Sequence, residues 1–370
     1  MSMMGIIFSN IYDERLGEIT SRRTLASLPF GGRYRLIDFV LSNMVNSGIT
    51  NVGVITKQNY QSLMDHLGNG KEWDLDRKID GLFILPPFGT GQKSVYQGKI
   101  EALWGTYRFL ERSNEEYIVL SDANIICNMD YRAMLKKHIA SGAQISVITK
   151  KEAITGREDA RDLVVRSDMD GRIADVLMHY GMPGTVSSGI GMYIMKRSFL
   201  LELLAEAHSY NLVDFEREII QARYKYIPMA NLEFDGRILR VDNVNHYFAA
   251  NMALLDQDVR DEVFFRHGVI YTKIRDEVPT RYARGCKISN SLIADGCEIR
   301  GTVENSILFR GVTVGEGAVV KNCIIMQNTK IEDQVELDYT ICDKDVTVTA
   351  GRLLMGAPAH QIIISKGKVV

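Results

Sequence analysis

The first half of the chain alternates short apolar runs with segments of helical periodicity. Four apolar runs predict buried strands, at residues 4–8, 52–55, 117–120 and 145–148. Residues 36–47 and 131–140 predict helices between them. This alternation is typical of a Rossmann-like α/β domain, with a mostly parallel sheet covered by helices on both faces. Such sheets bind ligands at the carboxyl ends of their strands, so the candidate site follows Phe8, Leu120 and Ile148.

A different pattern begins beyond about residue 260, where an apolar position recurs every six residues. The series runs through Ile293, Ile299, Leu308, Val314, Val320, Ile325, Ile331 and Leu337. A period of six fits neither a helix nor a meander, and it predicts a left-handed parallel β-helix in which each hexad forms one face of a coil. The phase shifts near Asn305 and Asn322, which we expect to be loops or corners.

The two patterns divide the chain into two domains and a connector. We expect an α/β domain over residues 1–260, a connector over 261–279 with Pro279 as a hinge, and the β-helix over 280–370. A chain of 370 residues is long enough for each domain to bury a core of its own.

Composition excludes some classes of ligand and indicates the cellular compartment. The chain has 44 Lys and Arg against 46 Asp and Glu, a net charge of -2, which leaves no basic field for nucleic acid or an anionic membrane. The N-terminus lacks the features of a signal peptide, and no stretch approaches the roughly 18 apolar residues of a membrane span. We therefore expect a cytoplasmic protein that binds neither nucleic acid nor membrane. Its five cysteines form no C-x-x-C pair, and we expect reduced thiols.

Several motifs carry a resemblance to a known family. Residues 30–39 read FGGRYRLIDF, and LSN at 41–43, NSGI at 46–49, WDLDR at 73–77, MDY at 129–131 and ANM at 250–252 follow in order. In this order the motifs resemble the glucose-1-phosphate adenylyltransferase (ADP-glucose pyrophosphorylase) family, and the hexad tail lies where that family carries its β-helix. The resemblance spans essentially the whole chain.

The resemblance implies a GT-A-like nucleotidyltransferase domain. The family joins ATP and glucose 1-phosphate into ADP-glucose and pyrophosphate, the step that commits carbon to glycogen. Such chemistry needs a backbone cradle for the triphosphate, magnesium held by carboxylates, and a cation for the sugar phosphate. Each of these parts has a counterpart position in this chain.

The phosphate cradle of the family is a glycine-rich loop after the first strand. Here residues 9–16 read SNIYDERL, without a glycine, although only glycine lets a backbone approach phosphates closely at positive φ. Asp13 and Glu14 add negative charge where the triphosphate would lie. Like charges near 4 Å repel by about 1 kcal/mol in water and about 4 kcal/mol at an effective dielectric of ~20. We expect no tight triphosphate binding in the usual pose, although Arg15 matches the family's arginine in this loop.

The two metal-binding aspartates of the family fall on Asn124 and Arg240, counted without gaps from Met129 and Asn251. Replacing two carboxylates by an amide and a guanidinium changes the local charge from -2 to +1, which repels a magnesium ion. The resemblance therefore implies no metal and no cofactor in this chain, with magnesium only in a catalytic partner.

Two lysines that the family uses to bind phosphate are also missing, which again indicates a loss of catalytic activity. The lysine of the family's Ala-Lys-Pro run falls on Leu25, and its sugar-phosphate lysine has no counterpart in residues 173–183. The nucleobase segment keeps Tyr96 and Gly98, so we expect a nucleotide-like pocket around these residues and Arg15. The degenerate catalytic positions are Leu25, Asn124 and Arg240.

The substitutions fall on the reactive positions of the family, whereas the motif at residues 30–49 is kept. In this combination the chain resembles a GlgD-type chain. The resemblance implies a non-catalytic or weakly active regulatory subunit of ADP-glucose pyrophosphorylase in glycogen biosynthesis. Such a chain modulates a catalytic GlgC-type subunit in a mixed tetramer. For the spared motif itself we expect a structural role, with Arg35 and Asp38 as an ion pair.

Two other functions remain open. Asp122 and Asp242 lie two positions from the lost aspartates, so a rearranged metal site could keep an adenylyltransferase active. Two residues of strand move a side chain about 6.6 Å, whereas magnesium requires ligands at about 2.0 to 2.1 Å, which disfavours this alternative. An acyltransferase acting through the β-helix is the weaker alternative, because no histidine falls between His267 and His360.

A further hypothesis, compatible with a regulatory role, is an anion site. Its candidates are Arg15, Arg22, Arg23, Arg33, Arg35 and Arg240. Guanidinium groups match phosphate bidentately, so these residues would bind a sugar-phosphate or nucleotide effector, with Arg240 pairing with a phosphate directly. Unpaired, solvated arginines are the alternative.

Overall fold

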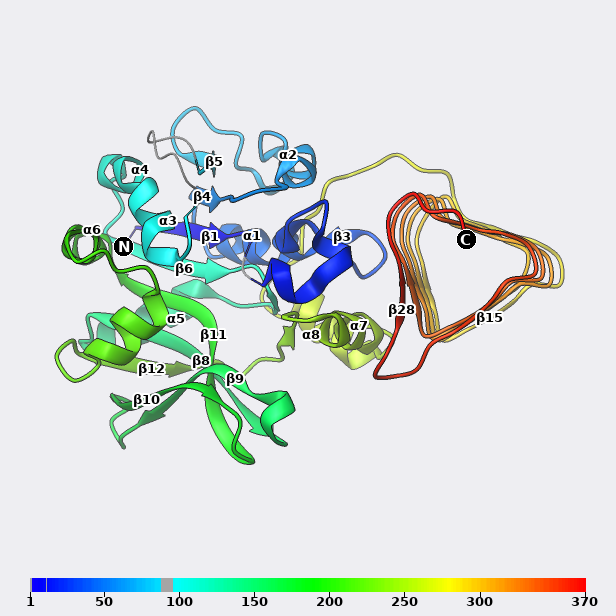
Figure 1. The fold of residues 1–370 in the computed structure, drawn as a ribbon. Coiled ribbons are helices and arrows are strands. Elements are labelled where there is room, and N and C mark those ends of the chain that lie inside the picture. The colour runs from blue at the N-terminus through cyan, green and yellow to red at the C-terminus, as the bar shows by residue number, and fades with distance from the viewer. Residues whose placement is uncertain (1, 11, 88–95) are drawn as a thin grey trace.

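The computed structural model describes residues 2–10, 12–87 and 96–370, so Ile11 of the loop after the first strand lies outside the described residues. Figure 1 shows an α/β domain beside a β-helix of triangular outline, with an extended segment leading from one to the other. The last helix of the first domain ends at Phe265, and the first strand of the β-helix begins at Arg281.

A nine-stranded sheet, counted within the described residues, forms the centre of the α/β domain. Its strands are β1 (Met3–Phe8), β4 (Asn51–Ile55), β5 (Gly81–Leu85), β6 (Tyr117–Asp122), β8 (Ile145–Ile154), β9 (Arg161–Ser167), β10 (Ile173–Tyr180), β11 (Gly184–Lys196) and β12 (Met229–Glu233). They lie in the order β10-β9-β11-β6-β1-β4-β5, and β8 pairs with β11 and β12. All four predicted strands are therefore present.

The strands run parallel in only part of this sheet. β1 is parallel to β4 and β6, and β4 is parallel to β5, as the alternation of strands and helices predicts. Beyond β6, however, β11 is antiparallel to β6, β8 and β9, so the expectation of a mostly parallel sheet is wrong there. The reason is that β8 to β11 follow one another through short connections, and a chain that turns back directly pairs antiparallel.

Helices cover both faces of the sheet. They are α1 (Leu36–Asn46), α2 (Gln61–Leu67), α3 (Lys99–Gly105), α4 (Tyr107–Arg112), α5 (Tyr131–Ser141), α6 (Arg197–Ser209), α7 (Val244–Ala253) and α8 (Gln257–Phe265), with short helices η1 (Asp13–Thr20), η2 (Leu25–Ser27), η3 (Lys71–Trp73), η4 (Arg157–Asp159) and η5 (Phe215–Gln221). Two short strand pairs, β2 (Pro29–Phe30) with β3 (Tyr34–Arg35) and β7 (Ile125–Ile126) with β13 (Leu239–Arg240), lie beside the sheet. In the part of the chain that the structure describes, no helix is long and apolar enough to cross a membrane.

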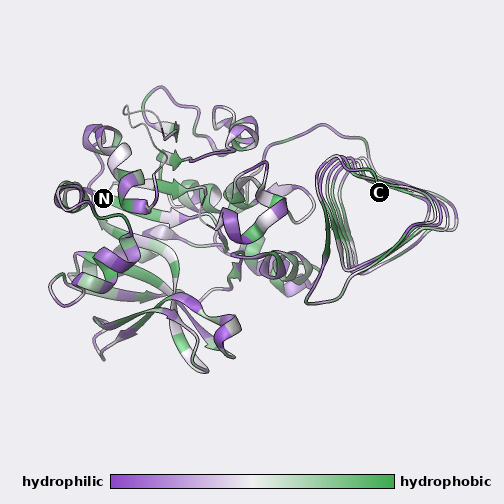
Figure 2. Cartoon of the chain, in the orientation of Figure 1, coloured by the Kyte–Doolittle hydropathy of each residue, from purple (hydrophilic) through white to green (hydrophobic). Residues whose placement is uncertain are grey.

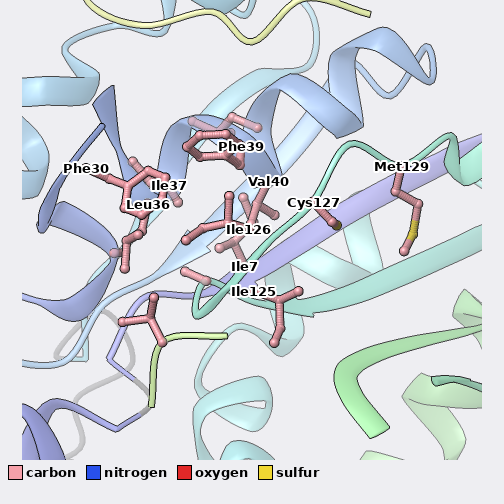
Figure 3. Close-up of a cluster of buried hydrophobic side chains, with 14 of the residues drawn as sticks. Ile7, Phe30, Leu36, Ile37, Phe39, Val40, Ile125, Ile126, Cys127 and Met129 are labelled. Carbon is pink, nitrogen blue, oxygen red and sulfur yellow. The ribbon is translucent and has the colours of Figure 1, made fainter. Parts of the chain in front are cut away.

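Alternation along the strands divides the core into two clusters. On β1, Ile7 belongs to the cluster that includes α1 and α5, whereas Met4 and Ile6 belong to the cluster that includes α3 and α6. Figure 2 shows the apolar strands inside and polar helix surfaces outside. Figure 3 shows part of the first cluster, with Phe39 and Val40 of α1 near Ile7. The site is thus held by a sheet that is buried on both faces.

The second domain is a left-handed β-helix built from three parallel five-stranded sheets. The first sheet has β14 (Arg281–Tyr282), β17 (Glu298–Ile299), β20 (Thr313–Val314), β23 (Lys330–Ile331) and β26 (Thr347–Val348). The second has β15 (Lys287–Ser289), β18 (Thr302–Glu304), β21 (Val319–Lys321), β24 (Glu336–Asp338) and β27 (Leu353–Met355). The third has β16 (Leu292–Ile293), β19 (Ile307–Leu308), β22 (Ile324–Ile325), β25 (Thr340–Cys342) and β28 (Ile362–Ile364).

The hexad series occupies the inside of this β-helix. Seven of its eight members form the buried core of the domain, and Ile293 packs against that core. Asn305 and Asn322 have positive φ, 46° and 48°, which confirms them as corners, because asparagine adopts this conformation more readily than most residues. The five cysteines are free, and Cys286 is the one among them that is not buried.

One outer face of the β-helix joins the core of the α/β domain. Ile307, Ile324 and Ile341 point outward from the third sheet, yet all are fully buried in the cluster that contains α1. A buried ion pair between Arg23 and Asp343 crosses the same interface. Continuous apolar packing and a buried ion pair both oppose relative rotation of the domains, so a hinge at Pro279 does not fit the structure.

Candidate functional site

A central cleft of about 290 Å³ opens at the carboxyl ends of β1 and β6. The sequence-predicted positions that line it are Arg15, Gly98, Asp122, Asn124 and Arg240. Leu25, Tyr96 and Asp242 lie outside its lining. The cleft therefore lies where the general rule for such sheets predicts for the segments after Phe8 and Leu120. The segment directly after Ile148 does not line it.

The loop after β1 folds on itself through its own carboxylate. Asp13 accepts hydrogen bonds from the backbone N–H of Leu25, at 2.7 Å, and from Nδ2 of Asn10, at 2.5 Å. Burial raises the pKa of Asp13 to about 6, although these donors oppose the shift. Residues from Asp13 onward form η1 in place of an open loop. A backbone donor that could hold a phosphate is thus already taken by a carboxylate of the chain.

Arg15 lines the central cleft but is engaged by a neighbour. Its Nη1 and Nη2 donate to the two carboxylate oxygens of Asp162 at 3.0 and 3.2 Å, and its guanidinium lies 4.7 Å from the centre of the Tyr12 ring. Burial tends to raise the pKa of Asp162, but the hydrogen bonds and charge of Arg15 hold it below its usual value. An incoming phosphate would have to displace this carboxylate.

Asn124 and Arg240 come together as the motif counts predict. β7 and β13 pair with Arg240 opposite Ile125, and the N–H of Val241 donates to the backbone oxygen of Asn124 at 2.8 Å. The Arg240 guanidinium donates through Nη2 to Oε1 of Glu152 at 2.9 Å. An amide and a guanidinium therefore lie close together at the two positions that the motif counts assign to the family's metal carboxylates.

Asp122 is held by a buried lysine that the sequence analysis missed. Lys99 Nζ donates to Oδ2 of Asp122 at 2.9 Å and also to Oε1 of Glu216. Burial tends to lower the pKa of Lys99, but these two carboxylates outweigh burial and hold it above its ordinary value, so the lysine carries a full charge. The available signal was a lysine inside the apolar face of α3, directly after Gly98.

The residues of the central cleft do not fit a magnesium ion. The ammonium of Lys99 already lies at 2.9 Å from Asp122, where a second cation would be repelled. Asp242, the other carboxylate of a rearranged site, pairs with His246 and accepts from Asn243 instead of lining the cleft. Magnesium requires several free oxygen ligands close together. Of the carboxylates that line the cleft, Asp122 and Glu216 are already paired with Lys99, and Asp162 is paired with Arg15.

Tyr96 and Gly98 line a small hollow beside the central cleft. The Tyr96 hydroxyl donates to the backbone oxygen of Thr56 at 2.5 Å. A Cβ on Gly98 would lie 2.2 Å from the backbone oxygen of Val213, so the chain needs glycine here for close packing. Both residues therefore have structural roles that account for them without a nucleotide.

A second cleft, of about 200 Å³, lies between the two domains and is strongly cationic. Its six Lys and Arg residues are Arg33, Arg35, Lys273, Arg275, Arg310 and Lys344. They face His66 and a single acidic residue, Asp345. We call this the interdomain cleft. Corner positions of successive β-helix coils, 310, 327 and 344, contribute to it, and their spacing of 17 is the signal that sequence reasoning could have used.

The cations of the interdomain cleft lack carboxylate partners. Within residues 2–10, 12–87 and 96–370, none of the six forms a salt bridge. Arg310 is buried, and its Nε and Nη2 have no hydrogen-bond partner among the described residues. Burial and the neighbouring arginines lower the pKa of Lys344 to about 7 and that of Arg35 to about 10. An anion would relieve this crowding of positive charge.

The structure does not bring the predicted anion-binding arginines into one place. Arg33 and Arg35 line the interdomain cleft, and Arg240 lies in the central cleft. Arg23 is buried and donates through Nη2 to both oxygens of Asp343 at 2.6 Å, whereas Arg22 is exposed. Four separate environments therefore replace the single expected site.

The expected ion pair between Arg35 and Asp38 is also wrong. Asp38 accepts from the backbone N–H of Arg35 at 2.9 Å and pairs with Nε2 of His66 at 2.5 Å. The Arg35 side chain donates to the backbone oxygen of Ser62. Asp38 thus caps α1, which leaves the Arg35 guanidinium at the interdomain cleft.

The fold and its central cleft define a sugar-nucleotidyltransferase domain followed by a hexapeptide-repeat β-helix. Residues 4–231 match the nucleotidyl transferase family, and residues 277–360 match the GlmU-like C-terminal hexapeptide family. The glycogen biosynthesis protein GlgD of Bacillus subtilis (strain 168) is 34% identical over 367 residues, 99% of this chain and 96% of that protein. GlgD of Geobacillus stearothermophilus is 38% identical over 324 residues, 86% of this chain and 82% of that protein.

An enzyme of the same group is similarly related. The glucose-1-phosphate adenylyltransferase of Thermosipho africanus (strain TCF52B) is 34% identical over 323 residues, 86% of this chain and 78% of that protein. The chain belongs to the family of glucose-1-phosphate adenylyltransferases and GlgD proteins.

Proposed function

We propose that this chain acts in glycogen biosynthesis as a non-catalytic or weakly active regulatory subunit. It joins a catalytic adenylyltransferase chain in a mixed assembly and changes that chain's activity. The catalytic chain supplies the magnesium site and converts ATP and glucose 1-phosphate into ADP-glucose and pyrophosphate.

The central cleft carries this proposal. Lys99 forms an ion pair with Asp122, and Arg240 lies close to Asn124 across the paired strands. The motif counts assign these last two positions to the family's metal carboxylates. A divalent cation there would meet two full positive charges. The loop from Asp13 is closed by its own hydrogen bonds, so a triphosphate also lacks a cradle. What the chain keeps intact is the framework of both domains.

The interdomain cleft supports a regulatory role. Six cations without carboxylate partners in the described residues form a site for an anionic effector, a sugar phosphate or a nucleotide. The cleft is lined by the motif at Arg33 and Arg35, by the connector and by the β-helix, so an anion bound there contacts both domains. Such an effector would stabilise the packing of the two domains against each other, and thereby the surface that a partner chain contacts.

Co-expression with a catalytic homologue from the same source tests the assembly. We expect the chain alone to release no pyrophosphate from ATP, glucose 1-phosphate and magnesium, and the mixed assembly to differ in rate from the catalytic chain alone. Turnover by the isolated chain that disappears in Asp122→Asn would instead establish the active alternative built on Asp122 and Asp242. A catalytic chain that neither co-purifies with this chain nor changes its rate would refute the proposal.

The effector site is tested by anion binding. We expect inorganic phosphate, glucose 1-phosphate or AMP to bind the isolated chain and to lose about tenfold in affinity in Arg310→Gln, because a buried charge-assisted bond is worth about 1.5–3 kcal/mol. Arg22→Gln, on the exposed surface, is the matched control and should bind as the parent does. Equal loss in both variants, or no binding at millimolar concentrations, would refute the site.

A further inference from the structure

A further cavity lies on the surface of the α/β domain, separate from both clefts. It has a volume of about 900 Å³ and is formed between α6 and residues 210–227, the segment that contains η5. Figure 1 shows α6 on the side of the domain opposite the β-helix. η5 separates this cavity from the central cleft, because Glu216 lines the cleft whereas Arg217 and Glu218 line the cavity. We call the cavity the α6 groove.

The α6 groove has an apolar base and two exposed aromatic rings. Leu203 belongs to the core cluster that includes α3 and α6, and Phe199 packs against that cluster, so the base of the groove is held in place. Tyr210 and Tyr226 also line the groove, yet they are 67% and 84% exposed. Apolar surface gathered in an exposed hollow commonly marks a binding site. The faces of two tyrosine rings are therefore available to a ligand.

The charged residues of the α6 groove balance one another. Arg223 pairs through Nη1 with Oε2 of Glu206 at 2.9 Å, and Oε2 of Glu218 accepts two backbone N–H groups. Glu202 and Arg217 remain, one of each sign, and neither forms a salt bridge within the part of the chain that the structure describes. A charged ligand would be attracted by one of these two groups and repelled by the other. An uncharged ligand that both donates and accepts hydrogen bonds can use both.

We infer that the α6 groove binds a linear glucan, an uncharged chain of glucose units. A pyranose ring has C–H faces that pack on tyrosine rings, and hydroxyl groups that donate to a carboxylate and accept from a guanidinium. The volume of about 900 Å³ lies near the upper end of the ~300–1,000 Å³ of small-molecule pockets, so the groove has room for several sugar rings. Exposed rings also suit a polymer, because a chain can enter and leave an open groove at either end.

The choice of an α-linked glucan rests on the proposed role in glycogen biosynthesis, because glycogen is a polymer of this chemistry. A glucan chain held by the α6 groove would keep the mixed assembly close to the polymer that consumes ADP-glucose. The groove shares none of its described lining residues with the central cleft or the interdomain cleft, so glucan binding needs neither magnesium nor an anionic effector.

Two groove variants and two controls test the inference. Tyr210→Ala and Tyr226→Ala each remove one ring, and because both side chains are exposed, neither change opens a cavity in the core. Tyr226→Phe keeps the ring and removes the hydroxyl group. Tyr282→Ala is the matched control, since Tyr282 is 54% exposed on β14 and does not line the groove. Unchanged thermal unfolding of each variant establishes that it is folded.

Calorimetric titration of the isolated full chain with maltohexaose and with D-glucose measures binding, and electrophoresis in gels that contain glycogen measures retention by the polymer. We expect saturable binding of maltohexaose with a millimolar or lower dissociation constant, weaker binding of D-glucose, and retarded migration in glycogen gels. Tyr210→Ala and Tyr226→Ala should each weaken maltohexaose binding about three- to tenfold, whereas Tyr226→Phe and Tyr282→Ala should bind as the parent does.

No saturable binding, equal affinity for D-glucose and maltohexaose, or unchanged affinity in Tyr226→Ala would each overturn the inference. It would also be overturned if the parent bound no maltohexaose and the groove variants no longer co-purified with the catalytic chain, since the groove would then contact the partner protein. Because glucan binding is measured without the catalytic chain, its failure leaves the co-expression test of the regulatory role unaffected.

Discussion

The buried ion pair between Arg23 and Asp343 should be a major determinant of how the two domains hold together. Both side chains are 3% exposed, and one arginine nitrogen donates to both carboxylate oxygens at 2.6 Å. In Arg23→Met the Asp343 carboxylate keeps the backbone N–H of Lys344 at 2.7 Å but loses its counter-charge. Leaving a buried charge unpaired costs about 3–5 kcal/mol, so we expect a loss of that size.

A double-variant cycle separates the charge from the packing. Asp343→Leu alone should also destabilise the protein, because it leaves Arg23 unpaired. The double variant, Arg23→Met with Asp343→Leu, replaces the pair by apolar groups of similar size and should recover most of the loss. Arg15→Met is the matched control: its pair with Asp162 is 49% and 30% exposed, so its loss should stay within about 1 kcal/mol.

Urea unfolding measures these losses with two probes. Trp73 and Trp104 are the chain's two tryptophans, and both lie in the α/β domain, whereas circular dichroism reports both domains. Coincident curves in the parent that separate in Arg23→Met would indicate that the pair couples the domains. If Arg23→Met lost no more stability than Arg15→Met, or if the double variant were as unstable as the single ones, the argument from burial would be refuted.

Three further predictions follow from single contacts. Burial and the positive charges of Arg35, Arg23 and Lys366 outweigh Asp343 and lower the pKa of Lys344 to about 7, below the ~10.4 of an unfolded chain. Because a bound anion favours the protonated form, sulfate affinity should fall by up to about tenfold per pH unit above pH 7. In calorimetric titrations, Lys344→Met should flatten that pH profile. Gly98→Ala should lower stability by about 1–3 kcal/mol in thermal unfolding, because its Cβ would meet the Val213 oxygen, whereas Gly156→Ala, with open space around it, should be nearly neutral. The double variant Asn124→Asp with Arg240→Asp should release no more pyrophosphate than the parent in a coupled assay, because Lys99 and the closed loop at Asp13 remain. Magnesium-dependent turnover by this double variant would contradict the argument that Lys99 and the closed loop prevent catalysis.

Local periodicity accounts for most of what could be predicted about the fold. The hexad series predicts the inner face of the β-helix, and Asn305 and Asn322 mark its corners, because each depends on residues a few positions apart. The strands at β1, β4, β6 and β8 follow from short apolar runs in the same way. The antiparallel half of the sheet could not be predicted so, because apolar runs do not encode the direction in which two strands pair.

For the candidate sites, too, the sequence predicted what depends on local motifs and missed what depends on distant residues. The motif counts assigned Asn124 and Arg240 to one site, because each residue was counted from a motif of the family. The structure does bring the two residues close together, through the pairing of β7 with β13. They could not show that Arg15 is bound to Asp162, or that Lys99 is bound to Asp122 and Glu216, because these partners are far apart in the sequence. The interdomain cleft was missed for that reason as well.

By itself, the sequence determined the two-domain class and the period of the β-helix, and it predicted the loss of glycine and carboxylate from the positions that the family resemblance assigns to a triphosphate and magnesium. These are properties of residue type and spacing. Only the tertiary structure decided which charges are neutralised and which are left unpaired, because that depends on side chains brought together from distant segments. The cations of the central cleft are paired with carboxylates of the chain, whereas the interdomain cleft gathers cations without carboxylate partners in the described residues from the segment at Arg33 and Arg35, from the connector and from stacked coils.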